Sequence, residues 1–405
     1  MTGSPCIVDA PQQTPGQWAV RWFGIVFVAL LLGSVPVFHL VWHVALGHED
    51  PPLRTRSQVT MPAATTTNVL DGTWMKDAER SLREASPVVW WLRAWWNELR
   101  YRASVPECAQ VHFGQREWFF LQQTVTPDTA RFVANAETRR RTFAAVRDLV
   151  HAAGAELFVQ IIPDKVRVYP ELAFADGVLP AAVADNYRRV LDELRAEGIH
   201  TVDFAAVMAG ARAADATSEL YYRRDTHWRP AGALAYGAAA AAAIEQHFGS
   251  RLSARQPMEL GEALEVRALG DLVANQGLAS VELPRDDGNG FRTTAMSLLT
   301  DHLGELRQYY GVKQRTAAGT VPMTGADPDA EILVIGTSFA EENGSNALAL
   351  CLGRPVRTVI ERGAAGILSL QKAKVELQRG TKAKVVVWEI IERGLFDPPW
   401  YPPRW

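Results

Sequence analysis

The chain has 405 residues, of which 48% are hydrophobic, and a formal net charge of −3. A chain of this length can bury one large core or two modest ones. The near-neutral balance excludes the strongly basic surface of a nucleic-acid-binding protein, so we expect no nucleic-acid partner. Its three cysteines, Cys6, Cys108 and Cys351, are too few and too scattered for a disulfide framework or a metal site. One disulfide between Cys108 and Cys351 stays open in an oxidising compartment.

The N-terminal region carries a localisation signal. Residues 22–46 contain no Asp, Glu, Lys or Arg, and about 25 such residues can span a hydrocarbon layer of roughly 30 Å. The sequence therefore predicts one transmembrane helix at 22–46, after a cytoplasmic tail at 1–21 and before a Pro/Thr-rich linker at 47–69. A cleaved signal peptide would begin with basic residues, whereas Asp9 precedes this segment, so we expect a retained anchor.

A segment rich in tryptophan and arginine follows the linker, from Trp74 to Arg102, with apolar residues at helical spacing. Such a surface could stack on sugar rings, lie at the membrane interface or pack its aromatic face on the folded domain. We interpret it as a packing helix.

From Val111 onward, helical and strand patterns alternate. Strand-like aromatic residues flank a turn at 111–120, and an irregular insertion with some strand is expected at about 250–330, where Gly and Pro interrupt the periodicity. The remaining elements are helices at 137–153, 180–197, 230–248, 343–351 and 368–379 and strands at 156–163, 199–204, 332–335 and 384–391. This alternation predicts an α/β fold with a mostly parallel sheet of about five strands and helices on both faces.

Two short segments carry the candidate chemistry. In RRDTHWRPAG, Asp225 and His227 lie two residues apart, so in an extended segment the carboxylate can orient the imidazole. Pro230 suits a first helical turn, which places the pair in a loop just before a helix. The later segment ILVIGTSFA reads as a buried strand that ends in a tight turn with an exposed Ser338 hydroxyl. Together the segments supply a nucleophile, a base and a residue that orients the base.

Each of these residues also has a plainer interpretation. Taken alone, Asp225 and His227 could be a surface loop pair, and Ser338 could cap a helix. Lys165, beside Pro163, could bind a polysaccharide carboxylate or only solvate a loop. Four further residues have similar alternatives: Arg223 and Arg224 could line an acidic sugar groove or be solvated, Trp228 could stack on sugar or pack over the histidine loop, and Glu389 could support the site or be a plain strand-end carboxylate.

Three motifs resemble the alginate O-acetyltransferase AlgJ/AlgX-like family, whose domain has the SGNH-hydrolase fold. They are DTHWRPAG, a strand followed by GTSF, and VVVWEIIERGL near the end of the chain. The stretch IIPDKVRVYPE and the GDL at 270–272 fit the same pattern, so the similarity covers about residues 70–400. As in that family, the Asp-x-His precedes the serine, in the reverse of the usual SGNH order. The chain departs from the family at Glu117 and Trp118, where the family has a Gly-Trp pair, and in reading Gly-Thr-Ser where many SGNH proteins have Gly-Asp-Ser.

The resemblance implies a three-layer α/β/α domain over 70–400, with Ser338 as nucleophile, His227 as general base and Asp225 as its orienting partner. It implies an O-acetyltransferase anchored in the bacterial inner membrane, with its catalytic domain in the periplasm. The sequence itself contains no Gly-rich phosphate loop, and its nine histidines show no ligand spacing, so we expect no cofactor or metal. The acetyl group would pass through an acyl-serine to an alginate-like or cellulose-like exopolysaccharide.

The partners implied are a multispanning membrane O-acyltransferase that supplies acetyl groups and other exopolysaccharide synthesis or secretion proteins. Two alternatives remain open from the sequence. One is a carbohydrate acetylesterase with the same triad, and the other is a non-catalytic polysaccharide-binding subunit of a secretion complex.

Overall fold

The computed structural model describes residues 63–70, 72–77, 96, 99, 110–275, 304–316, 319–362, 369–396 and 400. The predicted tail, the predicted anchor, Cys108, and most of the linker and of the predicted helix at 74–102 lie outside these residues. Within them, no helix combines the length and the apolar character needed to cross a bilayer. Cys351 carries a free, partly buried thiol.

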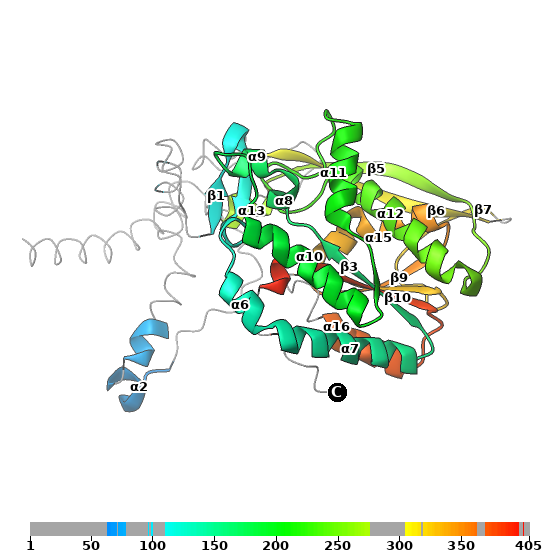
Figure 1. Ribbon diagram of the computed structural model, residues 1–405, viewed down its shortest axis with the longest axis horizontal. Coiled ribbons are helices and arrows are strands. Elements are labelled where there is room, and N and C mark those ends of the chain that lie inside the picture. The colour runs from blue at the N-terminus through cyan, green and yellow to red at the C-terminus, as the bar shows by residue number, and fades with distance from the viewer. Residues whose placement is uncertain are drawn as a thin grey trace, which may run out of the picture.

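Five parallel strands form the central sheet, in the order β4-β3-β10-β8-β9 (Figure 1). Their bounds are β3 Glu156–Ile162, β4 His200–Thr201, β8 Ile332–Gly336, β9 Val356–Ile360 and β10 Val385–Ile391. The prediction of about five parallel strands is confirmed. Every residue of the central strand β10 is buried, because helices cover both faces of the sheet and leave no solvent side to alternate toward.

In the described part of the chain, three helices of eight or more residues cover each face of the sheet, which gives the predicted three layers (Figure 1). One layer holds α7 Ala136–Ala152, α10 Ala181–Ala196 and α16 Ser369–Gln378, and the other holds α11 Phe204–Ala214, α12 Pro230–Phe248 and α15 Ser345–Leu352. As predicted, α7 and α10 stop just before Gly154 and Gly198, whose φ angles of 80° and 72° favour glycine at a helix end.

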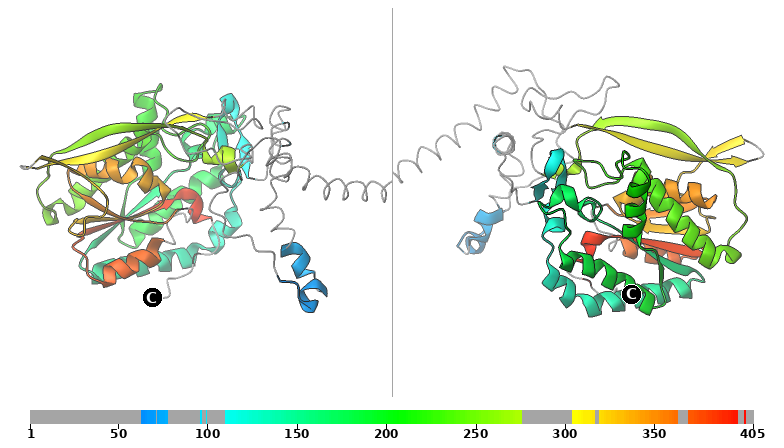
Figure 2. Two further views of the ribbon diagram at one scale, coloured as in Figure 1. Left: turned by 180° about the vertical axis from the view of Figure 1, so that it is seen from behind. Right: turned by 45° about the horizontal axis from the view of Figure 1, so that its top comes forward.

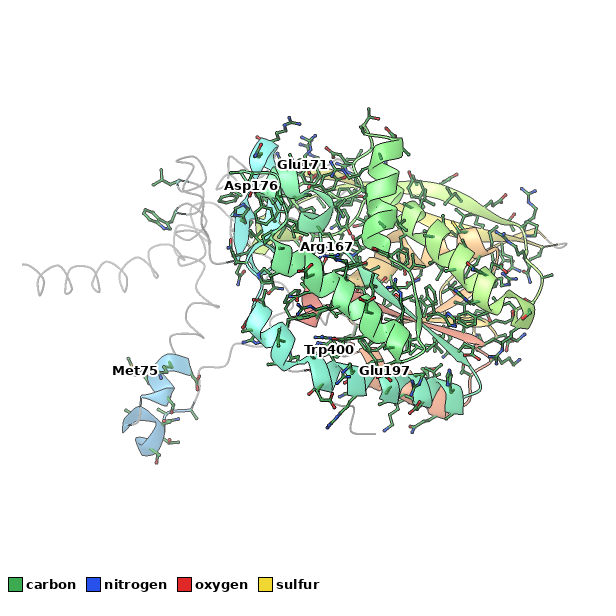
Figure 3. All side chains as sticks on the ribbon, in the orientation of Figure 1. Met75, Arg167, Glu171, Asp176, Glu197 and Trp400 are labelled. Atoms are coloured by element: carbon green, nitrogen blue, oxygen red, sulfur yellow. The ribbon has the colours of Figure 1, made fainter. Side chains whose placement is uncertain are left out.

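Aromatic side chains fill the core on both faces. On the α7 side, the ring of Phe143 lies 5.8 Å from that of Trp388 and 5.4 Å from that of Trp400, which is labelled in Figure 3. On the α12 side, Trp228 packs 4.8 Å from Tyr236 and 5.1 Å from Phe339 between ring centroids. Because Trp228 and Phe339 each follow a candidate site residue directly in sequence, this second cluster forms the floor of the site.

The predicted strand at 199–204 is wrong beyond its first residues. The strand β4 comprises only His200–Thr201, and α11 begins at Phe204, where no helix was predicted. The carboxylate of Asp203 accepts a hydrogen bond of 3.0 Å from the Ala206 N–H. This cap satisfies a free donor of the first helical turn, so the helix begins early.

The region predicted as an irregular insertion with some strand contains a three-stranded antiparallel sheet, which confirms the expected strand content (Figure 2). Its strands are β5 Met258–Ala268, β6 Glu305–Thr316 and β7 Gly319–Pro322. No residue of β5 or β7 is buried, so the hydrophobic alternation by which a strand is recognised is weak. The sheet contacts α12 and α15.

Short elements complete the fold. The strands β1 Val111–Phe113 and β2 Phe119–Leu121 pair antiparallel, which confirms the predicted aromatic hairpin. The short helices are α2 Thr66–Leu70, η2 Gln115–Glu117, α5 Gln122–Val125, α6 Thr129–Ala134, α8 Lys165–Val168, α9 Pro170–Ala173, η3 Gly249–Arg251, α13 Asp271–Asn275, η4 Ala340–Gly344 and η5 Glu392–Leu395.

Two helical glycines provide a matched test of this packing. A Cβ at Gly237 in α12 would lie 2.6 Å from the backbone carbon of Ala347 in α15, whereas a Cβ at Gly210 in α11 meets nothing within 4 Å. Gly237→Ala should therefore lower the free energy of unfolding by roughly 1–3 kcal/mol through overpacking. Gly210→Ala should raise it by about 0.5–1 kcal/mol. Urea unfolding of the two variants measures both, and equal effects would contradict the close α12–α15 contact.

Candidate active site

The structure brings Asp225, His227 and Ser338 together into one hydrogen-bonded chain. His227 Nδ1 lies 2.6 Å from Asp225 Oδ1, and His227 Nε2 lies 2.7 Å from Ser338 Oγ. Since Nδ1 faces a carboxylate, it carries the proton in the neutral ring, which leaves the Nε2 lone pair for the hydroxyl. Asp225 is buried and Ser338 is partly exposed, so the chain of contacts runs from the interior to an accessible oxygen.

Burial and charge act in opposite directions on this pair. Burial by itself would raise the pKa of Asp225, but the hydrogen bond and the charge of His227 hold it well below its usual range. Burial would lower the pKa of His227, but Asp225 outweighs this effect and raises that pKa. The pair is therefore arranged to stabilise an imidazolium next to a carboxylate, which is what proton transfer from a serine hydroxyl requires.

The GDL segment holds the far side of Asp225. The Asp271 N–H donates to Asp225 Oδ2 at 2.9 Å, and Asp271 Oδ1 accepts from the Thr226 N–H at 2.7 Å. A Cβ on Gly270 would lie 2.0 Å from the Arg224 carbonyl oxygen. Only glycine allows the two backbone segments to approach this closely, so the motif is explained by packing against the catalytic loop.

Lys165 has a different role from the predicted one. Its side chain is 5% exposed, and its Nζ donates three hydrogen bonds of 2.8–3.1 Å to the carbonyl oxygens of Tyr222, Arg223 and Asp225. Burial lowers the pKa of this amine to about 8. All three donors are used within the protein, so Lys165 fixes the catalytic loop and has none left for a polysaccharide carboxylate.

The other predicted substrate-binding residues also contact the protein itself. Trp228 is fully buried, and its Nε1 donates to a backbone carbonyl at 2.6 Å, so no face of the indole is available to a sugar. Arg224 is 7% exposed and pairs with Glu117. Arg223 is 46% exposed in its side chain and pairs with Glu219 at 2.6 Å. Of the four predicted residues, Arg223 alone is exposed enough to reach a ligand.

Glu389 supports the turn that presents Ser338. Although it lies within the central strand β10 and is fully buried, its Oε1 accepts from the Thr337 N–H at 3.0 Å, the Thr337 hydroxyl at 2.6 Å and the Ala340 N–H at 3.2 Å. Burial raises the pKa of this carboxyl to about 7. The interpretation of Glu389 as a plain strand-end carboxylate was wrong. The sequence signal for a supporting role was a single acidic residue within the otherwise apolar segment VVVWEII.

Sequence reasoning missed two charged residues next to the imidazole. Glu342 Oε2 lies 3.9 Å from His227 Nδ1, and Arg307 Nη1 lies 3.4 Å from Asp225 Oδ2. Glu342 belongs to the turn after Ser338, and Arg307 belongs to β6, in the region predicted to be irregular. No motif in the sequence distinguishes either residue.

Three residues of the site could together ligate a metal ion, because one potential ligand atom from each lies within 4.8 Å of the others. They are Asp225, His227 and Asp271. Hydrogen bonds already use these atoms: Nδ1 contacts Asp225, and both oxygens of Asp271 contact Thr226. The arrangement therefore fits a hydrogen-bonded relay, and we assign no metal to it.

The family match and the similar proteins point to the same family. Residues 111–392 match the family described as SGNH hydrolase-like domain, acetyltransferase AlgX. The probable alginate O-acetylase AlgJ of Pseudomonas syringae pv. tomato is 27% identical over 398 residues, covering 94% of this chain and 92% of that protein. The protein of the same name from Pseudomonas putida is 28% identical over 72% of this chain and 73% of its own length.

Two solved structures share the fold. The O-acetyltransferase domain of Pseudomonas putida AlgJ superimposes with a TM-score of 0.54 and 26% identity, over 72% of this chain and 96% of that domain. Pseudomonas aeruginosa AlgX gives a TM-score of 0.51 with 20% identity, over 69% of this chain and 62% of that one. The family match extends from β1 to η5 and contains Asp225, His227 and Ser338, and this chain therefore belongs to the family of SGNH hydrolase-like acetyltransferases represented by AlgX.

Proposed function

We propose that this O-acetyltransferase moves an acetyl group through an acyl intermediate on Ser338 to a hydroxyl of an exopolysaccharide. The observation that carries the proposal is the relay of 2.6 Å and 2.7 Å contacts from Asp225 through His227 to Ser338. A serine hydroxyl is a weak nucleophile near neutral pH. An imidazole within hydrogen-bond reach activates it by accepting its proton.

In the first half-reaction, Ser338 Oγ attacks the acetyl carbonyl carbon while His227 Nε2 accepts the hydroxyl proton. The Asp225 carboxylate stabilises the imidazolium that forms. The bond between the acetyl carbon and the donor oxygen then breaks, and the donor leaves with the proton from His227. The backbone N–H of Ser338 is our candidate donor to the oxyanion.

In the second half-reaction, a sugar hydroxyl gives its proton to Nε2 and attacks the acetyl-serine. Ser338 leaves and recovers a proton from His227, so the enzyme returns to its starting state. Water in place of the sugar hydroxyl would make the same residues an acetylesterase. The two activities therefore differ in whether the acceptor excludes water from the acyl-serine.

The proposed acceptor polymer rests on the names of the similar proteins. Because they are named as probable alginate O-acetylases, we propose an alginate-like polymer as acceptor, with a cellulose-like polymer as the other polysaccharide to test. The domain would act in the periplasm, held at the inner membrane by residues 22–46. Since acetyl-CoA does not cross the bilayer, a multispanning membrane O-acyltransferase would supply the acetyl group, next to other exopolysaccharide secretion proteins.

Covalent labelling tests the nucleophile. After incubation of the purified protein with an activated acetyl ester, mass spectrometry should find one acetyl group on the peptide that contains Ser338. Ser338→Ala should abolish that label, and Ser345→Ala, seven residues further on, should keep it.

Adding alginate or cellulose oligosaccharides then separates the activities. Acetylated sugar supports the transferase, whereas free acetate in the presence of acceptor supports the esterase. A folded wild-type protein that stays unlabelled would contradict the acyl-serine and favour a non-catalytic polysaccharide-binding subunit.

The pH dependence should reflect His227. Only the neutral imidazole accepts a proton, and its pKa is raised above 6.5, so kcat/KM should rise with pH through a midpoint above 6.5. Asp225→Asn removes the charge that raises this pKa, and it should move the midpoint to lower pH and reduce the plateau rate by roughly 10⁴-fold. Asp215→Asn, an exposed acid with no contact to the site, is the control. A midpoint that is unchanged in Asp225→Asn would exclude His227 as the titrating base.

Glu389 should be needed as a hydrogen-bond acceptor more than as a charge. Its pKa of about 7 means that charged and neutral forms coexist near neutrality. Glu389→Gln keeps an acceptor oxygen and should leave the Ser338 labelling rate within a few-fold, whereas Glu389→Ala leaves buried donors unpaired and should lower the free energy of unfolding by roughly 1–3 kcal/mol or more. Urea unfolding and labelling rates compare the two. If Gln is as damaging as Ala, the negative charge itself is required.

A further inference from the structure

The strand β6 connects the two loops that carry the triad. At its start, the Glu305 carboxylate accepts from the Arg223 and Arg224 N–H groups at 2.9 Å and 2.7 Å, next to Asp225. Further along, the Tyr310 N–H donates to Asn343 Oδ1 at 2.8 Å, in the turn that follows Ser338. The same strand therefore holds both the base and the nucleophile segments from outside the central sheet.

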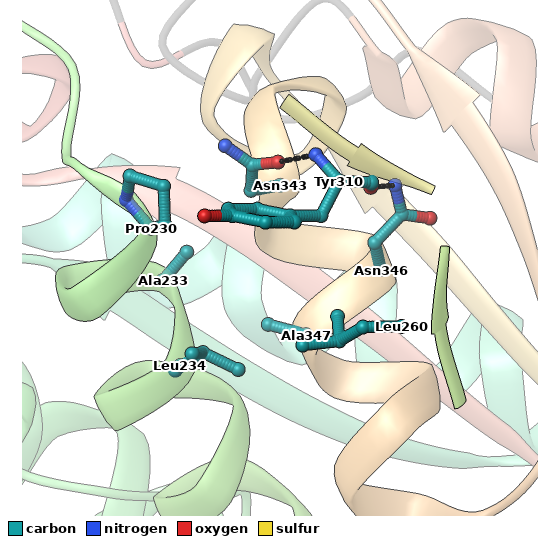
Figure 4. Close-up of a pocket in the computed structure, with 8 residues that line it drawn as sticks. All are labelled: Pro230, Ala233, Leu234, Leu260, Tyr310, Asn343, Asn346 and Ala347. Atoms are coloured by element: carbon teal, nitrogen blue, oxygen red, sulfur yellow. Dashed lines mark hydrogen bonds between the residues drawn. The ribbon is translucent and has the colours of Figure 1, made fainter. Parts of the chain in front are cut away.

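The second of these attachments is closely packed. Figure 4 shows the Tyr310 ring between the turn after Ser338 and the start of α12, with Asn346 Nδ2 donating to the Tyr310 carbonyl at 2.6 Å. The pocket beside this ring is only about 10 Å³, which is too small for anything larger than a water molecule. The position of β6 next to the triad is thus fixed by packing and hydrogen bonds.

Between these attachments, the guanidinium of Arg307 reaches the triad. Its Nη1 lies 3.4 Å from Asp225 Oδ2, on the side of the carboxylate that is turned away from His227, and its Nη2 pairs with Glu342. The side chain is 12% exposed. The rings of Tyr222 and Tyr309 lie 5.4 Å and 5.7 Å from its central carbon. One cation from the inserted sheet therefore contacts two carboxylates that face the same imidazole.

The surroundings of His227 are otherwise acidic. Asp225 lies on its own loop, Asp271 on α13 is 3.9 Å from Nδ1, and Glu342 is equally close. Glu341 and Glu389 also interact electrostatically with the ring. The cations near this group are Arg307, which contacts Asp225 and Glu342, the buried Lys165, which interacts with Asp225 and Asp271, and the exposed Arg362, which pairs with Glu341 and interacts with Glu342.

We propose that Arg307 is a positioning residue of the triad, which neutralises Asp225 and Glu342 at once and so keeps the imidazole of His227 available as a base. The effect on the rate depends on the proposed function. The effect on the imidazole depends only on the contacts described above.

The sign of the expected effect follows from charge. Carboxylates near His227 stabilise the imidazolium and raise its pKa, and Arg307 counters two of them. Removing the guanidinium takes a contacting positive charge away from both carboxylates, so the pKa of His227 should rise further by about one unit. A larger fraction of the enzyme would then carry a protonated base that cannot accept the Ser338 proton.

The experiment uses the full chain in detergent, with ¹³C-labelled histidine and the His227 signal assigned by His227→Ala. In Arg307→Met, the NMR titration midpoint of His227 and the acid limb of Ser338 acetylation should both move up by about one pH unit. Arg307→Lys should restore part of the shift, because it returns the charge with a single contact. Arg315→Met is the matched control, since Arg315 lies on the same strand in an exposed pair with Glu259 and should change neither midpoint.

A second variant separates this effect from a loss of structure. Adding Glu342→Gln to Arg307→Met removes one of the two carboxylate charges and should lower the His227 midpoint again. If Arg307→Met does not fold, Glu342→Gln alone is decisive, because it leaves the guanidinium in excess and should lower that midpoint below the wild-type value.

An unchanged or lowered midpoint in folded Arg307→Met overturns the proposal, and so does an unchanged midpoint in Glu342→Gln alone. Because the NMR titration needs no turnover, it reports on Arg307 even if Ser338 proves not to be acylated. Failure of the proposed function and failure of this inference are therefore distinguishable.

Discussion

The structure depends on one imidazole that contacts two distant parts of the chain. His227 bonds to Asp225 two residues away and to Ser338, 111 positions further on. The two partners must therefore be held in place together, although His227 lies in an irregular loop and Ser338 is the first helical residue after β8. The fold meets this requirement by ending β8 two residues before Ser338 and by starting α12 three residues after His227, so rigid elements hold both loops close to the point of contact.

Buried polar groups do the remaining positioning. Lys165 donates hydrogen bonds to three carbonyl oxygens of the loop that carries Asp225. Glu389 accepts hydrogen bonds from three donors of the turn that carries Ser338. Burying such groups costs free energy unless they are fully hydrogen-bonded, and burial moves both pKa values toward the neutral form. A charged residue next to the site is therefore not by itself evidence of substrate contact. Here the buried charges shape the backbone on which the site is built.

Sequence reasoning succeeded where a local pattern determines the structure. The apolar strands β3, β8 and β10 and the spacing of Asp225 and His227 are readable because burial on both faces and a two-residue period leave clear signals. It failed where the partner is distant. Nothing in the sequence shows that the loop near residue 225 folds onto Lys165 or that Trp228 is enclosed by Tyr236 and Phe339. Some strand was expected in the insertion, but the alternation of its half-exposed strands is too weak to place each strand from the sequence.

The length of its strands explains how the inserted sheet reaches the triad, since β5 and β6 have 11 and 12 residues. The inserted segment begins after the 19-residue helix α12 and ends before β8, at the ends of these elements that lie away from the catalytic loops, and there the Ser253 N–H donates to Glu331 at 2.8 Å. From there β5 runs to Ala268, which pairs with Glu305 at the start of β6, and β6 hydrogen-bonds to one loop through Glu305 and to the other through Tyr310. Arg307 lies between these two attachments. A charge placed there contacts both carboxylates beside the imidazole, so a residue of the insertion completes the surroundings of a triad that the elements around the central sheet carry.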